Sequence, residues 1–94
     1  MTVVELFSEE PAENLLAALC LRPENVVFLG SSGVMTDWRI AAVRAFFRAR
    51  KSATNLRFLR VPEGNYTAIA NAIADILRLD PAAAFEMTGG SGLL

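Results

Sequence analysis

A glycine-rich run near the end of the chain is the stretch best suited to binding an anion. It consists of Thr88, Gly89, Gly90, Ser91 and Gly92, and it follows an apolar segment typical of a buried strand. Adjacent glycines leave the backbone N–H groups accessible because no Cβ shields them, and the hydroxyl groups of Thr88 and Ser91 add further donors. The sequence therefore predicts an anion-binding loop at this position.

The residue types that usually perform catalysis are scarce. The chain has no histidine and a single cysteine, Cys20, which lies in an apolar helical pattern that favours a buried, inert thiol. Histidine is the commonest general base and a frequent metal ligand, so we expect neither acid–base catalysis nor a zinc site in this segment. We accordingly expect a non-enzymatic segment without a metal or other cofactor.

A second glycine-containing stretch, at residues 30–33, follows an apolar run and precedes a helical pattern. It lacks the third glycine of the dinucleotide fingerprint and the lysine of a phosphate-binding loop. Two interpretations remain open for Ser31 and Ser32: direct contact with a ligand, or a flexible loop at the rim of a site. Trp38, near the start of the following helix, is a further candidate contact at that rim.

Two groups of basic residues have structural explanations. One group lies in the last turns of an expected helix, where cations complement the negative end of the helix: Arg44, Arg48, Arg50 and Lys51. The other, Arg57 and Arg60, lies on a strand expected at the edge of the sheet, where charge protects against aggregation. Neither group predicts direct binding of nucleic acid by this segment.

Strand-like and helix-like segments alternate along the chain. Strands are predicted over 2–7, 25–29, 55–61 and 83–88, and helices from Ser8 to near Arg22, over 36–50, and from the N-cap Asn65 to Asp80. This alternation is typical of repeated βαβ units, which form parallel sheets with right-handed crossovers. We expect an α/β, Rossmann-like three-layer sandwich with a mainly parallel four-stranded sheet in the order 3-2-1-4, three helices and a truncated C-terminal end.

Apolar spacing indicates which side of each helix packs on the sheet. In the second helix the expected apolar residues are Ile40, Val43, Phe46 and Phe47, and in the third they are Tyr66, Ile69, Ile73, Ile76 and Leu77. The first two helices should cover one face and the third the other. We expect the less covered face and the open edge at strand four to drive self-association.

The order 3-2-1-4 places strands one and four side by side, with a crevice at their carboxyl ends. Ser8 and Glu9 would border this crevice from the first strand, and Thr88, Gly89, Gly90 and Ser91 from the fourth. Ser8 also begins a helix, where free N–H groups favour an anion. The alternative is that Ser8 only caps its helix and that the glycines only turn the chain.

Length and composition indicate the size of the domain and the class of protein. At 94 residues, with 53% hydrophobic and 20% charged residues and a net charge of −1, the chain is expected to form one small globular domain, residues 1–94. The first residues do not have the pattern of a signal peptide, and no apolar run in the sequence is long enough to span a membrane, so we expect no signal peptide and a cytoplasmic location. Because only Leu93 and Leu94 follow the glycine-rich loop, we expect the chain to be the N-terminal part of a larger domain.

With these features assembled, the chain resembles the N-terminal part of the CARF domain, the CRISPR-associated Rossmann fold, in the subgroup fused to a restriction-endonuclease-like nuclease domain. Two motifs carry the resemblance. Leu6, Phe7, Ser8, Glu9 and Glu10 are similar to the end of the family's first strand, and Met87, Thr88, Gly89, Gly90 and Ser91 are similar to its Thr-Gly-Gly-Thr/Ser loop.

The resemblance implies a homodimer that binds a cyclic oligoadenylate second messenger and regulates an attached effector nuclease in CRISPR-linked antiviral defence. Ser8 and Glu9 would line the pocket, and the loop from Thr88 to Ser91 would contact phosphate or ribose. Gly92 departs from the family, which often has a lysine there, and so removes one charged phosphate contact. Alternatives are a Rossmann-like enzyme domain for a dinucleotide or S-adenosylmethionine, and a ligand-free assembly module.

Overall fold

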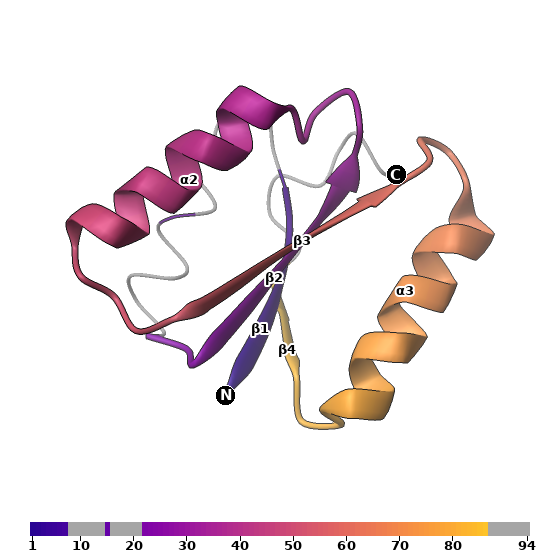
Figure 1. Cartoon of the computed structure of the whole chain (residues 1–94). Helices are drawn as coiled ribbons and strands as arrows, with labels where there is room; N and C mark the ends of the chain where they lie inside the picture. The colour runs from indigo at the N-terminus through magenta and orange to yellow at the C-terminus, as the bar shows by residue number, and fades with distance from the viewer. Residues whose placement is uncertain (8–14, 16–21, 87–94) are drawn as a thin grey trace.

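The computed structural model describes residues 1–7, 15 and 22–86 of the chain. Its elements are β1 (Thr2–Leu6), β2 (Asn25–Ser31), α2 (Asp37–Ala49), β3 (Asn55–Val61), α3 (Tyr66–Leu79) and β4 (Ala84–Glu86), as Figure 1 shows. The strands form one sheet in the order β3-β2-β1-β4, and every neighbouring pair is parallel. The predicted α/β fold and strand order are therefore confirmed.

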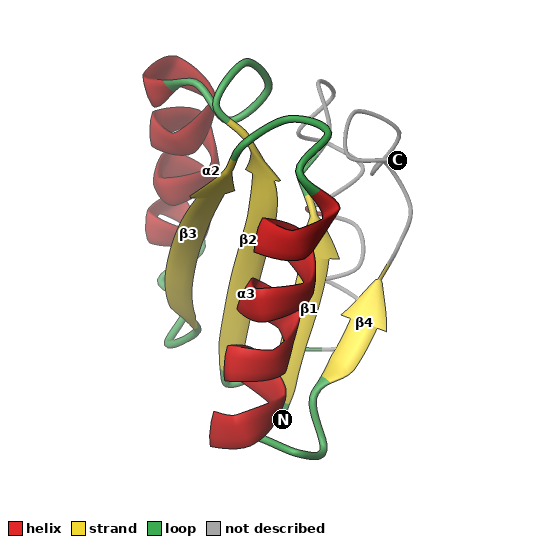
Figure 2. Cartoon of the chain, turned by 90° about the vertical axis from the view of Figure 1, so that its right-hand side faces the viewer, coloured by secondary structure: helices red, strands yellow, loops and turns green. Residues whose placement is uncertain are grey.

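Two of the three predicted helices fall in the described part of the chain, and they lie on opposite faces of the sheet. Figure 2 shows α3 in front of the sheet and α2 behind it. The helix predicted from Ser8 lies outside the described residues except at Leu15, which is helical and packs against the same core cluster as α2. That contact agrees with the prediction that the first helix shares the face of α2.

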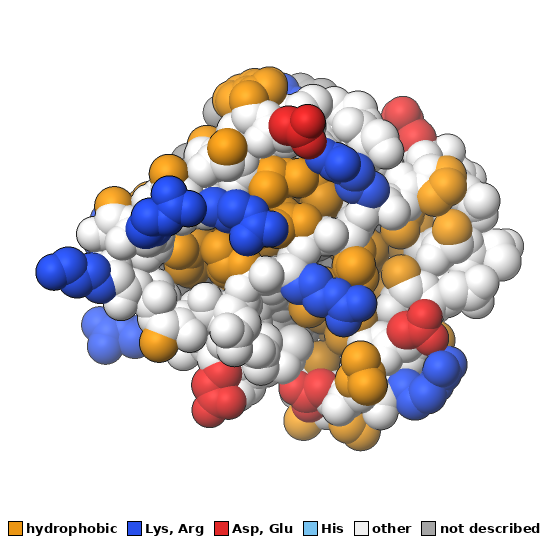
Figure 3. Space-filling model, in the orientation of Figure 1, with side chains coloured by type: hydrophobic (Ala, Val, Ile, Leu, Met, Phe, Trp, Pro, Cys, Tyr) orange, Lys and Arg blue, Asp and Glu red, His pale blue; other side chains and the backbone are white. Residues whose placement is uncertain are grey.

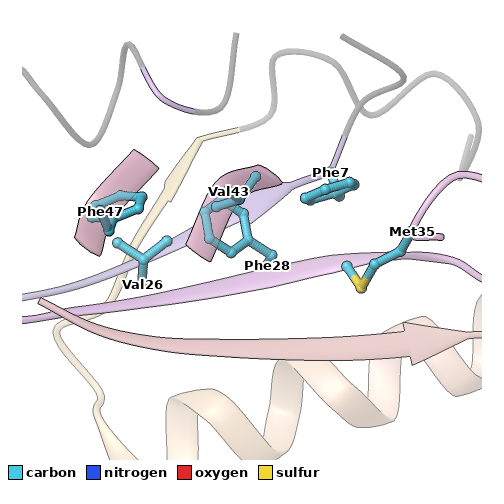
Figure 4. Close-up of a cluster of buried hydrophobic side chains, with 6 residues drawn as sticks. All are labelled: Phe7, Val26, Phe28, Met35, Val43 and Phe47. Carbon is cyan, nitrogen blue, oxygen red and sulfur yellow. The ribbon is translucent and has the colours of Figure 1, made fainter. Parts of the chain in front are cut away.

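The core between α2 and the sheet is rich in aromatic rings. Its buried members are Phe7, Val26, Phe28, Met35, Val43 and Phe47 (Figure 4). The ring of Phe28 stacks on that of Phe58 with centroids 5.0 Å apart, and the edge of Phe7 approaches Phe28 at 5.6 Å. Burial of each large apolar side chain contributes about 1.5–3 kcal/mol, so this cluster holds α2 to β1 and β2.

The core beneath α3 is aliphatic. Ile69 and Ile73 pack against Leu6, Leu29 and Val61, and Ile76 packs against Val4 and Val27. Three of the five residues predicted for this stripe therefore contact the sheet.

The helix indicated by this period is confirmed, but Tyr66 and Leu77 are 62% and 36% exposed and lie outside the part that contacts the sheet. An α-helix turns by about 100° per residue, which places these two side chains about 60° and 80° away from the direction of Ile69. The sheet is in contact with a narrower arc of α3 than the sequence pattern suggested.

The start of α3 follows the predicted capping chemistry. The side-chain oxygen of Asn65 accepts a hydrogen bond from the N–H of Ala68 at 3.0 Å. The preceding turn is closed by the N–H of Asn65, which donates to the carbonyl of Pro62 at 3.2 Å. Gly64 in this turn has a φ of 72°, a conformation that glycine adopts without strain.

The structure corrects the predicted end of the second strand. β2 continues through Gly30 and Ser31, and both residues are buried rather than part of a flexible loop. A Cβ placed on Gly30 would lie 3.0 Å from Cβ of Phe7 and 3.3 Å from Cε of Met35. Both distances are shorter than ordinary van der Waals contacts, so a methyl group here would require Phe7 and Met35 to shift by a few tenths of an ångström.

We predict that Gly30→Ala lowers the free energy of unfolding by about 1–3 kcal/mol, the usual cost of overpacking a core. Gly33→Ala is the matched control, because no atom lies within 4 Å of a Cβ built there and its φ is outside the left-handed region. That variant should change stability by less than about 0.5 kcal/mol. Urea unfolding of both variants checks the prediction, and equal stabilities would contradict it.

Candidate functional site

The strands expected to form the site lie side by side. β1 and β4 pair in parallel with the register Val3↔Ala84, Val4↔Phe85 and Glu5↔Glu86. Because parallel strands end at the same edge of a sheet, the segments that follow Leu6 and Glu86 both start from one edge. The structure thus supplies the strand arrangement on which the predicted site depends.

The residues predicted to line that site lie outside the described part of the chain. They are Ser8 and Glu9, which follow β1, and Thr88, Gly89, Gly90 and Ser91, which follow β4. Cys20 also lies outside it.

The three candidate rim residues are placed on the β2–α2 connection. Ser31 is the last residue of β2 and is 2% exposed, Ser32 is exposed, and Trp38 is 63% exposed in the first turn of α2. Side chains alternate between the two faces of a strand, so Ser31 lies on the same face as Leu29, the face beneath α3. Ser31 is two residues closer than Leu29 to the carboxyl edge. The candidates therefore share one connection but have very different exposure.

Unsatisfied polar atoms are concentrated around this connection. Ser31 Oγ, Thr36 Oγ1 and Arg39 Nε are buried atoms that form no hydrogen bond with the residues that the structure describes. Burial of a polar group without a partner costs about 1–3 kcal/mol, and native proteins usually avoid it. A polar ligand or water would relieve this cost.

Backbone contacts fix the geometry of the connection. The carbonyl of Ser31 accepts hydrogen bonds from the N–H groups of Val34 at 3.2 Å and Met35 at 2.8 Å. The carbonyl of Val34 accepts from the N–H of Thr36 and from Nη1 of Arg39, each at 3.0 Å. These bonds link the three residues that carry unsatisfied atoms into one compact turn.

Sequence reasoning missed Arg39, although it considered the residue next to it. The Arg39 guanidinium carbon lies 4.8 Å from the centroid of the Trp38 ring, a cation–π contact. A cation in the first turn opposes the positive end of the helix dipole, and this unfavourable placement is the signal that could have identified it. Arg39 adds one positive charge to the carboxyl edge of β2.

Glu5 is the second residue whose environment sequence reasoning did not predict. It is 0% exposed at the centre of the sheet, and its Cα is paired in register with those of Phe28 and Glu86. Along β1 it lies on the same face as Phe7, which packs beneath α2. A carboxyl group thus stands inside the core, two residues below the carboxyl edge.

Within residues 1–7, 15 and 22–86, no three carboxylate, thiol or imidazole side chains are grouped so that they could hold a metal ion. None of the helices described is long and apolar enough to cross a membrane.

A groove of about 570 Å³ opens at the amino edge of the sheet, opposite the candidate site. The first residues of three strands line it, namely Thr2, Asn25 and Asn55, together with Ile76 and Leu79 near the end of α3. Amide Nδ2 of Asn55 donates to Oδ1 of Asn25 at 3.2 Å, and Nδ2 of Asn25 donates to the hydroxyl of Thr2 at 3.4 Å. The strand starts are thereby linked by side-chain hydrogen bonds.

We predict that Ser31→Ala leaves the free energy of unfolding unchanged or raises it by up to about 1 kcal/mol, because the lost hydroxyl is unsatisfied. Thr54→Val is the comparison, since the Thr54 hydroxyl donates to the carbonyl of Pro23 at 2.8 Å. Its loss should cost about 1 kcal/mol. Thermal and urea unfolding of both variants would contradict the prediction if Ser31→Ala were the more damaging change.

Comparison of the chain with protein-family models, with curated proteins and with solved structures found no match. The fold and the polar groups at its carboxyl edge are therefore the grounds for proposing a function.

Proposed function

We propose that the chain is a cytoplasmic, non-catalytic sensor domain of the CARF type, which binds a cyclic oligoadenylate at the carboxyl edge of β1 and β4 and acts as a homodimer. In this proposal the bound nucleotide regulates an attached effector nuclease. Ser8 and Glu9 contact the ligand from the first strand, and the loop from Thr88 to Ser91 contacts its phosphates. The observation that carries the proposal is the parallel pairing of β1 with β4.

This pairing matters because it joins two segments that are far apart in the sequence. The registers of β1 with β2 and with β4 direct the residues after Leu6 and after Glu86 to one edge, together with the end of β2. In open parallel sheets, ligands bind outside the carboxyl ends of the strands where the order reverses. In the order β3-β2-β1-β4, that point lies between β1 and β4.

The polar character of the same edge also supports a phosphate-containing ligand. Arg39 supplies a cation, and the buried hydroxyls of Ser31 and Thr36 make no hydrogen bond within the described residues. Hydroxyl, guanidinium and backbone N–H groups are suitable donors for phosphodiester oxygens. Trp38 adds an exposed aromatic ring against which an adenine base could stack.

A homodimer is supported by apolar groups on the α3 side and at the β4 edge. Phe85 of β4 is 37% exposed and Leu79 of α3 is 79% exposed. Phe85 is paired in register with Val4, which packs against Ile76, so Phe85 lies on the α3 face. Contact between two copies would remove these side chains from water.

Binding can be tested by calorimetric titration with cyclic tetra-adenylate and cyclic hexa-adenylate, and with NAD and S-adenosylmethionine as competing candidates. The chain should carry the residues that follow Leu94 in its gene, if there are any. We expect a cyclic adenylate to bind and Thr88→Val to weaken it about tenfold, because a hydrogen bond to a charged group contributes about 1.5–3 kcal/mol.

Thr67→Val is the matched control. Thr67 is exposed on α3, and the substitution replaces a hydroxyl by a methyl group just as Thr88→Val does. Its affinity for the cyclic adenylate should equal that of the unaltered chain. Absence of binding at tens of micromolar would refute the proposal, and binding of NAD or S-adenosylmethionine instead would favour the enzyme-domain alternative.

The dimer can be tested by light scattering coupled to size-exclusion chromatography. We expect a mass twice the 10.2 kDa of one chain, and a monomer for Phe85→Ser, because that change removes an apolar side chain from the contact. Trp38→Ser, which removes an exposed aromatic ring from α2, should remain dimeric. A monomeric unaltered chain at high concentration would contradict the prediction.

A further inference from the structure

The positive charge of the chain is concentrated in one region. Between residues 38 and 62 there are seven arginine and lysine residues and no aspartate or glutamate, although the whole chain has 9 basic and 10 acidic residues. This stretch comprises most of α2 and all of β3. In Figure 3 basic side chains gather on the face that shows the β3 edge, with apolar side chains between them.

β3 is one of the two outer strands of the described sheet, as predicted for the strand that carries Arg57 and Arg60. The N–H of Asn55 donates to the carbonyl of Glu24 at 2.8 Å, so it faces the chain segment that leads into β2. Successive N–H groups of a strand alternate in direction, and those of Leu56, Phe58 and Arg60 therefore point away from β2. These outward groups can pair with another extended chain.

Arginines flank this edge on the α2 side. Arg44 and Arg48 line a hollow of about 330 Å³ with Phe47, Ser52, Thr54, Asn55 and Leu56. The guanidinium of Arg44 lies 4.8 Å from the centroid of the Phe58 ring, so it is held over β3. Neither Arg44 nor Arg48 forms an ion pair with any residue that the structure describes, whereas Arg60 is paired with Asp37 at 2.7 Å.

We propose that the β3 edge binds an acidic, extended peptide, which adds to the sheet as a fifth strand with its carboxylates toward α2. Main-chain hydrogen bonds to Leu56, Phe58 and Arg60 hold the peptide along β3. Arg44 and Arg48 make the site prefer acidic side chains. This surface and its ligand are separate from the nucleotide site between β1 and β4.

The same charges argue against a second copy at this edge. Pairing of β3 with β3 of another chain would bring Arg44, Arg48, Arg57 and Arg60 close to the same four residues of the partner. Like charges in register destabilise a strand pair, so arginines at an edge disfavour self-association.

The aromatic ring at this edge argues against a single-stranded nucleic acid. Such ligands bind through bases that stack on exposed aromatic rings. The Phe58 ring is stacked on Phe28 at 5.0 Å, and the guanidinium of Arg44 lies over it at 4.8 Å, so the ring is already engaged. The outward N–H groups of β3 are suited instead to the carbonyls of a peptide.

The experiment uses the full chain and a fluorescein-labelled octapeptide that alternates glutamate and threonine. Fluorescence anisotropy should show binding at low salt, and hydrogen exchange should show slower exchange at the amides of Leu56, Phe58 and Arg60 when the peptide is present. The double variant Arg44→Gln, Arg48→Gln should weaken binding roughly tenfold, since it removes two charge contacts. The variant Arg78→Gln removes a positive charge from α3, on the other face of the sheet, and should retain the affinity.

Two control ligands complete the test. A peptide with lysine in place of glutamate should not bind, and a peptide with proline in place of threonine, which lacks half of the main-chain N–H groups, should bind much more weakly. Equal binding of the proline peptide would overturn the proposal, as would no binding at peptide concentrations up to about 1 mM. Tighter binding of a single-stranded RNA octamer than of the acidic peptide would also overturn it.

Discussion

The burial of β1 is the constraint on which the rest of the structure depends. Every residue from Thr2 to Phe7 is buried, and the strand is paired in parallel with β2 on one side and β4 on the other. A strand in this position needs cover on both faces: Val4 and Leu6 pack beneath α3, and Phe7, directly after the strand, packs in the cluster beneath α2. Once β1 is enclosed in this way, the carboxyl ends of β2, β1 and β4 must meet at one edge.

Much of this arrangement could be predicted because local patterns and the global fold agree. The bounds of β3 and the cap at Asn65 follow from apolar runs and capping preferences, and the strand order follows from the βαβ repeat. The end of β2 could not be predicted, since Gly30 and Ser31 have the composition of a loop. Both residues are paired with β3, Gly30 with Arg60 and Ser31 with Val61, and Gly30 also lies close to Phe7 and Met35. The pairing with β3 is not visible in the local sequence.

The strand order on which the candidate site depends was predictable, but the polar groups of the β2–α2 connection were not. The strand order alone places a switch point between β1 and β4, and this requires no knowledge of side chains. Ser31, Thr36 and Arg39 carry buried atoms that have no hydrogen-bond partner among the described residues, and their positions depend on how the β2–α2 connection folds back on the carbonyls of Ser31 and Val34. In the described part of the chain, the buried hydroxyl groups of this connection lie near the carboxyl edge, whereas positive charge follows α2 and the β3 edge.

The most direct measurement of the central claim, that the carboxyl edge is the nucleotide site, is amide chemical-shift mapping of the ¹⁵N-labelled chain during titration with a cyclic oligoadenylate. We expect the largest shifts at Phe7, Ser31, Ser32 and Arg39, which belong to that edge. The amides of Thr2, Asn25 and Asn55 at the amino edge should stay unchanged. Largest shifts at the amino-edge groove, with the carboxyl edge silent, would contradict the claim.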